Sequence, residues 1–299
     1  MISPKKILFF GYSQLGYDAF QYLVNHFSVV GAVTHHINKA EPCWFDLVEE
    51  RAEEYGIPVF KPEISALESF TETVEQLNPD LIISVYYRYM IPMRILDIPQ
   101  LGSYNMHGSF LPHFRGCAPI NWAIVKGAKT SGVTLHEMVE KPDAGAIIAQ
   151  RSCIIGDNET AGELVEKMRP LSLEILKTAI PKIIDGTQKK TCVDIKKGSY
   201  FGRRKPDDGC INPLEQTAQE VHNLVRALQP ASQYPSAFLE IDGHKFFVHK
   251  TDVSAQPQKE SIQNVSIGAL YTLNDQEKWL YCKNGTWVKL CDITPMAIL

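Results

Sequence analysis

Three side chains in one stretch of the chain, Asn105, His107 and Asp143, have the types needed to transfer an acyl group. An imidazole can move a proton, an amide N–H can donate to a developing oxyanion, and a carboxylate can fix the imidazole tautomer. The alternation of Asn105, Met106 and His107 is typical of a strand, so the first and third side chains project to the same side. Each residue alone also has an ordinary explanation, as a turn former or a hydrogen-bonded side chain.

The surrounding segment, residues 103–150, predicts the elements that would position these side chains. Glycine and proline indicate a shaped loop after the first strand, at Gly108, Pro112, Gly116 and Pro119. A short helix is expected over 119–126, followed by strands over 132–139 and 146–151. Asp143 then begins a tight turn, Asp-Ala-Gly, between the two strands.

Strands alternate with helices in the part of the chain before this segment. Strands are predicted over 6–12, 27–35, 57–60 and 81–85, and helices over 13–26, 42–55 and 69–77. This order is typical of an α/β fold with a Rossmann-like, doubly wound parallel sheet, which binds ligands at the carboxyl ends of its strands. We expect Asn105 and His107 at such an end. Residues 85–91 favour either a packing cluster or a slot for a flat heterocycle.

The second half of the chain predicts a different architecture. A long helical pattern over 161–184 is interrupted at Pro170 and Pro181, and a polar crossover follows over 187–200. A helix over 217–228 is expected to present His222, Asn223 and Arg226 on its surface. From residue 237 short strands alternate with turns, with a hairpin at Asn284-Gly285 and a polar loop over 255–264. We therefore predict a catalytic domain over 1–200 and a small β-barrel-like (OB-like) domain over 201–299.

The composition excludes several classes of protein. The formal net charge of −4 gives no global attraction to nucleic acid or to an anionic membrane, and we expect neither partner. No apolar run reaches the roughly 18 residues of a membrane span, and the run after Lys5 and Lys6 is too short for a signal peptide. The seven cysteines are scattered without a Cys-x-x-Cys pair. This pattern predicts neither a zinc site nor disulfides and favours a reducing cytoplasm.

The pattern Asn-x-His-Gly-Ser-x-Leu-Pro-x-x-Arg-Gly begins at Asn105, with Gly-Val-Thr-Leu-His over 132–136 and Asp-Ala-Gly from Asp143. It resembles the signature of the 10-formyltetrahydrofolate-dependent formyltransferases. Residues 86–88, 105–109, 118–122, 143–147, 201–204 and 206–208 are similar to the members that formylate UDP-4-amino-4-deoxy-L-arabinose. The resemblance covers nearly the whole chain, and no dehydrogenase half follows, so a stand-alone transferase is expected. It implies formyl transfer to a nucleotide-linked 4-amino sugar, for lipopolysaccharide or O-antigen biosynthesis.

The resemblance also implies roles for individual residues. Asn105, His107 and Asp143 would form the catalytic triad, without a metal. The residues expected to bind the folate co-substrate are Tyr89, Met90, Ile91, Arg115, Val139, Glu140, Lys141, Pro142 and Asp143. Those expected to bind the nucleotide sugar are Tyr87, Ser109, Arg203 and Arg204, with Asp207 and Asp208 holding the arginine loop. The arabinose enzymes carry an arginine where this chain has Cys117, which removes a cation expected near the folate.

Three alternatives remain open. A methionyl-tRNA formyltransferase would need a basic footprint, whereas this chain is acidic and its segment 35–55 lacks the basic insertion loop of those enzymes. A phosphoribosyl-glycinamide formyltransferase lacks a C-terminal extension of this kind. A non-catalytic folate or nucleotide-sugar binding protein would not need all three catalytic side chains. The strand edges of the β-rich tail could support a homodimer.

Overall fold

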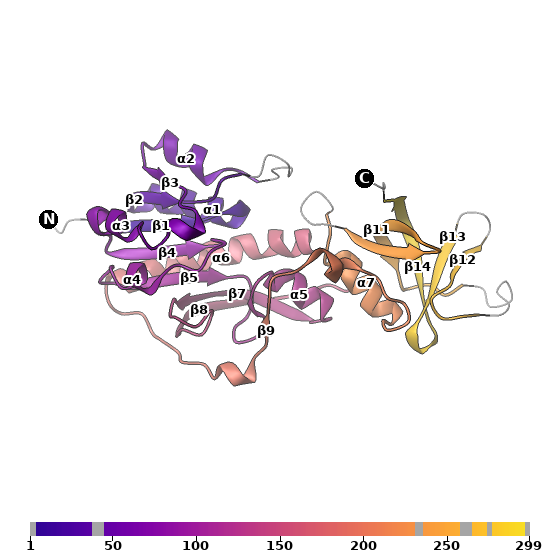
Figure 1. Ribbon diagram of the computed structural model, residues 1–299. Helices are drawn as coiled ribbons and strands as arrows, with labels where there is room; N and C mark the ends of the chain where they lie inside the picture. Colours follow the sequence, from indigo (N-terminus) through magenta and orange to yellow (C-terminus); the bar gives the residue numbers. More distant parts are fainter. Residues whose placement is uncertain (1–3, 38–44, 231–235, 258–264, 274–276, 297–299) are drawn as a thin grey trace. The chain divides into compact units, whose positions relative to one another are not determined.

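The computed structural model describes residues 4–37, 45–230, 236–257, 265–273 and 277–296 (Figure 1). Contacts within the chain divide it into two compact units. Unit 1 comprises residues 1–116, 131–153 and 166–201, and unit 2 comprises residues 117–130, 154–165 and 202–299. Two short segments that precede residue 166 therefore belong to the same unit as the C-terminal residues. The sequence-based domain boundary at 200/201 stays a prediction.

Unit 1 is built on a seven-stranded sheet in the order β3-β2-β1-β4-β5-β7-β8. Its strands are β1 Lys6–Gly11, β2 Ser28–Val33, β3 Val59–Phe60, β4 Leu81–Val85, β5 Ser103–His107, β7 Thr130–Glu137 and β8 Ile147–Ile154. The pairs from β3 to β5 are parallel, and β7 runs antiparallel to β5. The predicted α/β sheet is confirmed, but strand direction reverses at β7, the neighbour of the strand that carries His107.

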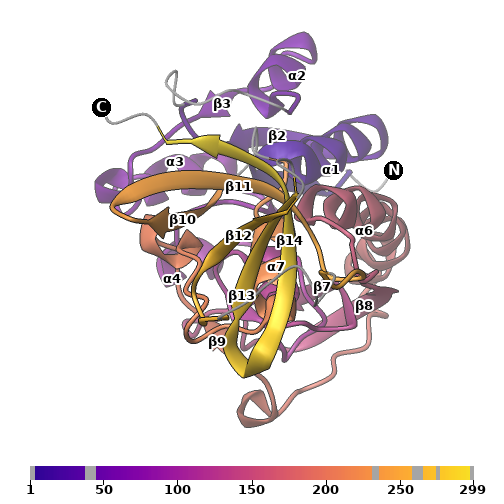
Figure 2. The same ribbon diagram turned by 90° about the vertical axis from the view of Figure 1, so that its right-hand side faces the viewer.

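Helices cover both faces of this sheet (Figure 2). They are α1 Ser13–His26, α2 Val48–Glu54, α3 Thr71–Leu77, α4 Met93–Leu96 and α6 Ala161–Ile184. On one face, α3 and α4 pack against Leu8, Phe10 and Ile82. On the other, the Phe20 ring of α1 lies 5.3 Å from the Phe9 ring. Every residue of β4 is buried, as expected for a strand covered on both sides.

Two helix predictions differ from the structure. The helix expected over 42–55 begins only at Val48, while residues 42–44 lie outside the described residues. Helix α6 continues through Pro170 and Pro181, which were expected to interrupt it. Each proline removes one backbone donor, but the apolar face of the helix is buried along its whole length. Its fully buried residues include Leu164, Met168, Ile175, Leu176, Ile180 and Ile183.

Unit 2 contains two short helices and a five-stranded antiparallel sheet. The helices are α5 Pro119–Val125 and α7 Ala218–Arg226. The strands are β10 Ala237–Ile241, β11 His244–Asp252, β12 Leu270–Leu273, β13 Glu277–Cys282 and β14 Thr286–Pro295, in the order β10-β11-β14-β13-β12. The predicted hairpin is confirmed, because Asn284 and Gly285 connect β13 to β14 with φ angles of 60° and 70°. Residues 258–264 of the expected polar loop lie outside the described residues.

Helix α7 buries the polar side chains that the sequence placed on its surface. His222, Asn223 and Arg226 are only 4–6% exposed, so the surface prediction is wrong. Arg226 donates from Nη1 to the carbonyl oxygens of Gly156 and Glu159, at 3.1 and 2.7 Å. Burial is tolerated because backbone acceptors from a distant segment satisfy the guanidinium.

Among the described residues, no helix has the length and hydropathy that a membrane crossing requires.

Candidate active site

The site begins with one face of the strand pair β5–β7. In the antiparallel register Asn105 lies opposite His136, and His107 lies opposite Thr134. Opposed residues point to the same face, and alternation brings both pairs to it. Tyr104 and Met106 point to the other face, where each is 1% exposed. His107 is the last residue of β5, so the two predicted side chains lie at a strand's carboxyl end, where the fold was expected to place them.

Asp143 reaches this face from the connection between β7 and β8. Its backbone has φ 51°, in the left-handed region. Its carboxylate Oδ2 accepts the backbone N–H of Gly116 at 2.7 Å. Gly116 itself has φ +94°, and a Cβ there would lie 2.2 Å from the carbonyl oxygen of Phe201. Only glycine fits this position, so the donor to Asp143 depends on it.

The three predicted catalytic side chains converge, together with a second histidine. Asp143 Oδ1 lies 3.5 Å from His107 Nδ1 and 3.4 Å from His136 Nε2. The amide Nδ2 of Asn105 lies 3.3 Å from the same His136 nitrogen. His107 Nε2 donates to the carbonyl oxygen of Phe114 at 2.9 Å. A proton added to the His107 ring would therefore lie at Nδ1, facing the Asp143 carboxylate.

Burial and charge set the protonation of this cluster. Burial acts to raise the pKa of Asp143, but His107 and the Gly116 N–H outweigh it and hold that pKa well below the ordinary carboxyl range. Burial lowers the pKa of His107; Asp143 and the Phe114 carbonyl oppose this shift, whereas His136 and Arg115 add to it. The site therefore pairs an ionised carboxylate with an imidazole that is neutral at neutral pH and able to accept a proton.

The first predicted folate segment is the connection between β4 and α4. Met90 is 58% exposed, whereas Ile91 is 7% exposed and packs in the apolar cluster with Leu8, Phe10 and Ile82. The Tyr89 ring lies edge-on to His35 at 4.6 Å, and the Tyr87 ring stacks on His35 at 4.3 Å. His35, Tyr87 and Tyr89 thus form one aromatic group, which includes the predicted nucleotide-sugar residue Tyr87.

The second predicted folate segment, 139–143, forms the connection that ends at Asp143. Val139, Glu140 and Lys141 are exposed, and Pro142 is half-buried. Arg115 is 7% exposed, with its guanidinium 5.7 Å from the centre of the Tyr200 ring. The Nε atom of Arg115 has no hydrogen-bond acceptor within the described residues. The structure thus leaves one buried cation beside the triad with unused donor capacity.

The other residues predicted to bind the nucleotide sugar are Ser109, Arg203 and Arg204. Ser109 has no exposed surface, and its hydroxyl donates to the carbonyl oxygen of His113 at 2.6 Å. Arg203 is exposed and Arg204 half-buried in unit 2, the unit that does not contain the triad. The Arg204 guanidinium lies over the Trp122 ring at 5.0 Å and donates to the Asp208 carbonyl at 2.9 Å. Cys117 is exposed in the same unit.

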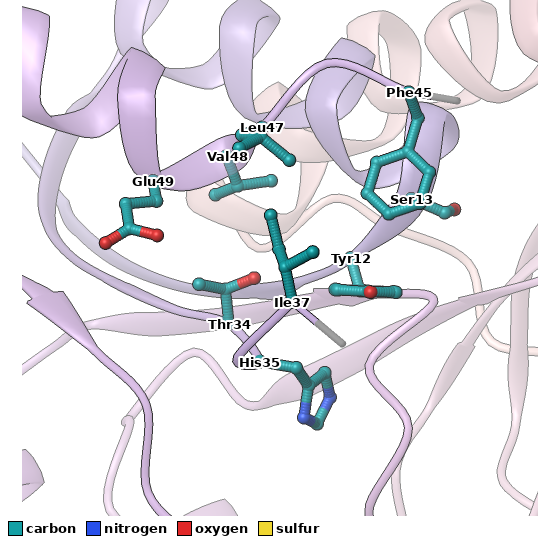
Figure 3. A pocket seen from close by; sticks show the side chains of 9 residues that line it. All are labelled: Tyr12, Ser13, Thr34, His35, Ile37, Phe45, Leu47, Val48 and Glu49. Carbon is teal, nitrogen blue, oxygen red and sulfur yellow. The ribbon is translucent and has the colours of Figure 1, made fainter. Parts of the chain in front are cut away.

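A pocket lies beside the aromatic group, at the carboxyl ends of β1 and β2 (Figure 3). It is lined by Tyr12, Ser13, Thr34, His35, Ile37, Phe45, Leu47, Val48 and Glu49. His35 Nε2 accepts the backbone N–H of Arg88 at 2.9 Å. Burial, helped by the charge of Arg88, lowers the pKa of His35 to about 4. The ring therefore stays neutral and holds the connection that carries Tyr89 and Met90.

Sequence reasoning gave no role to His35 or His136. His136 belongs to the quoted Gly-Val-Thr-Leu-His pattern, and its two-residue alternation with Thr134 was visible. What was missing is the pairing of residues 103–107 with 130–137, which no local pattern specifies.

Among the described residues, no group of three His, Cys, Asp or Glu side chains is arranged to hold a metal ion.

Comparison with known proteins places this geometry in a family. The family model described as "Formyl transferase" matches residues 25–180, more than half of the chain. The model of the formyl transferase C-terminal domain matches residues 203–297. The chain belongs to the formyl transferase family. It is 36% identical over 256 residues to the bifunctional polymyxin resistance protein ArnA of Wigglesworthia glossinidia brevipalpis, covering 85% of this chain and 39% of that protein. The chain thus spans well under half the length of this relative.

Solved structures of other formyl transferases share the fold. The sugar 3N-formyl transferase WlaRD, solved with dTDP and 5-N-formyl-THF, superposes with a TM-score of 0.69 at 19% identity, covering 99% of both chains. The N-formyltransferase of Helicobacter canadensis, in complex with folinic acid and dTDP-3-aminofucose, gives a TM-score of 0.72 at 20% identity. That match covers 96% of this chain and 98% of the other. The whole described architecture is therefore that of a formyl transferase.

Proposed function

We propose that this chain transfers a formyl group from 10-formyltetrahydrofolate to the amine of a nucleotide-linked amino sugar. The expected acceptor is UDP-4-amino-4-deoxy-L-arabinose or a related 4-amino sugar, for lipopolysaccharide or O-antigen biosynthesis. The observation that carries the proposal is the convergence of Asn105, His107 and Asp143 around one buried strand end. The 36% identity to a polymyxin resistance protein and the fold shared with sugar formyl transferases support the same substrate class.

The residues assigned to the folate fit a flat, partly apolar ligand. Met90 and Val139 are 58% and 39% exposed, so both segments present apolar surface to a ligand. Tyr87 and Met138 pack against a single apolar cluster, which links the two segments. The folate supplies the formyl carbon, and Arg115 offers a buried cation with an unused donor for an oxygen of the ligand.

The catalytic roles follow from the protonation of the cluster. The sugar amine attacks as the neutral base, so the rate falls at acidic pH. Asn105 donates its amide N–H to the formyl oxygen as negative charge develops there, and losing one such donor typically costs about 3–4 kcal/mol. His107 accepts the amine proton and returns it to the leaving nitrogen, while the Asp143 carboxylate balances the imidazolium.

Arg203 and Arg204 are proposed to bind the nucleotide diphosphate. Arg204 keeps one buried donor, Nη1, without a partner within the described residues. The loop is held by Asp208, whose carboxylate Oδ2 accepts the Lys205 backbone N–H at 2.6 Å. A braced loop with one guanidinium donor left over suits a hydrogen bond to a phosphate oxygen.

The test is an acceptor panel with purified chain and 10-formyltetrahydrofolate. The arms contain UDP-4-amino-4-deoxy-L-arabinose, a dTDP-linked 3-amino sugar and methionyl-tRNA, and products are identified by mass spectrometry as the gain of one CO unit. Formylation of the 4-amino sugar arm is expected, and it should be lost in His107→Ala but kept in His113→Ala, whose side chain is exposed. Formylation of methionyl-tRNA alone, or full activity of His107→Ala, would refute the proposal.

Three further statements remain predictions of the same hypothesis. The catalytic and C-terminal parts are proposed to divide near residue 200, the chain to act in the cytoplasm, and two copies to form a homodimer through strand edges. Limited proteolysis, fractionation of cells expressing the tagged protein, and analytical ultracentrifugation would test them in that order. A sedimentation coefficient of a monomer across the working concentration range would exclude the dimer.

A further inference from the structure

His136 is a second buried histidine in contact with the predicted triad. It is 2% exposed. Its Nε2 lies 3.3 Å from Asn105 Nδ2 and 3.4 Å from Asp143 Oδ1. The ring thus touches the two triad members that do not themselves exchange a proton in the proposed reaction. This placement points to a role in holding the other side chains.

The hydrogen-bond pattern fixes the tautomer of the ring. His136 Nδ1 lies 2.7 Å from the carbonyl oxygen of Glu137, which can only accept, so Nδ1 carries the proton. The backbone of Glu137 pairs closely with the segment around Gly145. The Glu137 N–H donates to Ala146 at 2.9 Å, and a Cβ at Gly145 would lie only 2.0 Å from the Glu137 oxygen. With its proton at Nδ1, the uncharged form of the ring presents a lone pair at Nε2.

This lone pair decides which end of the Asn105 amide faces inward. An asparagine amide can rotate to present either its N–H₂ donor or its carbonyl acceptor. Only the donor end can bond to the Nε2 lone pair, at the observed 3.3 Å. One Nδ2 hydrogen is used there, and the amide plane that carries the second hydrogen is fixed. A rotated amide would instead direct its oxygen toward the triad, where it would repel an oxyanion.

We propose that His136 is a positioning residue that holds the Asn105 amide with its N–H end available to the transferring formyl oxygen. The proposal rests on the proposed formyl transfer for its effect on rate. The contact itself does not depend on any activity. The backbone register that opposes Asn105 to His136 supplies the alignment, and the Glu137 carbonyl supplies the tautomer.

The kinetic test compares two substitutions at this position. His136→Phe keeps a ring but removes the acceptor, and should lower kcat about 10- to 100-fold with KM for both substrates changed less than about threefold. His136→Gln offers a side-chain oxygen to the Asn105 amide and should keep kcat within about threefold of the wild type. The exposed His113→Phe is the matched control. A wild-type kcat in His136→Phe, or equal losses in the Phe and Gln variants, would overturn the proposal.

A double-mutant cycle distinguishes positioning from general structural support. If His136 acts through Asn105, adding His136→Phe to Asn105→Ala should cost no more than about twofold in kcat, because the group to be oriented is already gone. Additive losses would show that His136 acts elsewhere. Circular dichroism melting of each variant checks the fold, and the Gln variant decides the question if the Phe variant does not fold.

A nuclear magnetic resonance measurement separates this inference from the proposed function. In ¹⁵N-asparagine-labelled protein, the Asn105 side-chain protons, assigned with Asn105→Asp, should be widely split in the wild type and in His136→Gln. In His136→Phe the splitting should collapse toward that of exposed asparagines. Widely split signals in a chain that formylates no acceptor would refute the proposed function alone. A splitting in the wild type no larger than that of exposed asparagines would refute the positioning role, whatever the activity.

Discussion

Replacing Asp143 with asparagine tests the electrostatic core of the site with almost no change in shape. In the wild type, a proton on His107 Nδ1 lies 3.5 Å from the carboxylate Oδ1. At that distance the attraction between unit charges is roughly 5 kcal/mol for an effective dielectric constant near 20. The amide keeps part of this interaction as a dipole, so we expect a loss of about 3 kcal/mol, or 100- to 1,000-fold in kcat.

The hydrogen bonds predict that the Asp143→Asn variant stays folded. The amide oxygen can still accept the Gly116 N–H, now made to Oδ2 at 2.7 Å. The amide N–H₂ group then faces His107 Nδ1 and His136 Nε2, which both carry lone pairs in the neutral rings. The variant would thus stay folded and hold His107 in the neutral form, unable to store the proton.

The pH dependence of stability provides a second readout for the same variant. The pKa of Asp143 is lowered in the folded state, so its ionisation stabilises the wild type at any pH above the ordinary carboxyl range. This stabilisation is lost as pH falls through that range and below it. The variant lacks the titrating group, so its thermal unfolding midpoint should fall less steeply than that of the wild type between pH 5 and pH 2. This window extends about one or two pH units to either side of the carboxyl pKa in the unfolded chain.

The assay for this prediction is steady-state formyl transfer with both substrates varied, alongside thermal unfolding followed by circular dichroism. The matched control is Asp157→Asn, which removes an exposed carboxylate paired with Lys129 at 2.6 Å and should leave kcat unchanged. A folded Asp143→Asn variant with kcat within threefold of the wild type would refute the electrostatic role.

Three other substitutions test how the site is supported. Gly116→Ala should lower activity at least tenfold without removing a functional side chain, because its φ is +94° and the new Cβ would lie 2.2 Å from a backbone oxygen; kcat of the purified variant checks this. His35→Gln should flatten the loss of stability on acidification. The pKa of His35 is lowered to about 4, so the wild type loses up to about 3 kcal/mol as pH falls from 6.5 to 4, and the exposed His36→Gln should keep that slope in urea unfolding. Arg169→Ala should lower the free energy of unfolding by about 1–2 kcal/mol, because it removes a two-pronged ion pair to Asp18 at 2.6 and 3.1 Å, and an unchanged urea midpoint would contradict this.

Local patterns predicted the parts of the site that depend on neighbouring residues. Alternation placed Asn105 and His107 on one side of a strand, and the Asp-Ala-Gly sequence predicted the turn that carries Asp143. Buried parallel strands appear in a sequence as continuous apolar runs. The alternation of such runs with helical patterns predicted the sheet. These inferences need only a few consecutive residues, and the folded chain agrees with them.

Features that depend on distant partners were missed or wrongly predicted. Arg226 was placed on the surface because an isolated sequence gives no sign that two carbonyl groups, some 70 residues earlier, will accept its hydrogen bonds. The sequence predicts helix breaks at Pro170 and Pro181 because it does not show how much apolar surface the helix buries. In each case tertiary contacts outweigh a local preference.

The role of His136 shows how one long-range pairing determines both the core and the site. β7 runs antiparallel to β5, which places Asn105 and His136 directly opposite each other, with Cβ atoms typically about 4.5–5.5 Å apart. A slip of one residue would exchange the two faces of β7. It would bring Leu135, which has no exposed surface, to the polar face and bury the His136 imidazole in the apolar core. The burial of Leu135 therefore selects the same register that brings an imidazole to the Asn105 amide, so the packing of one face enforces the chemistry of the other.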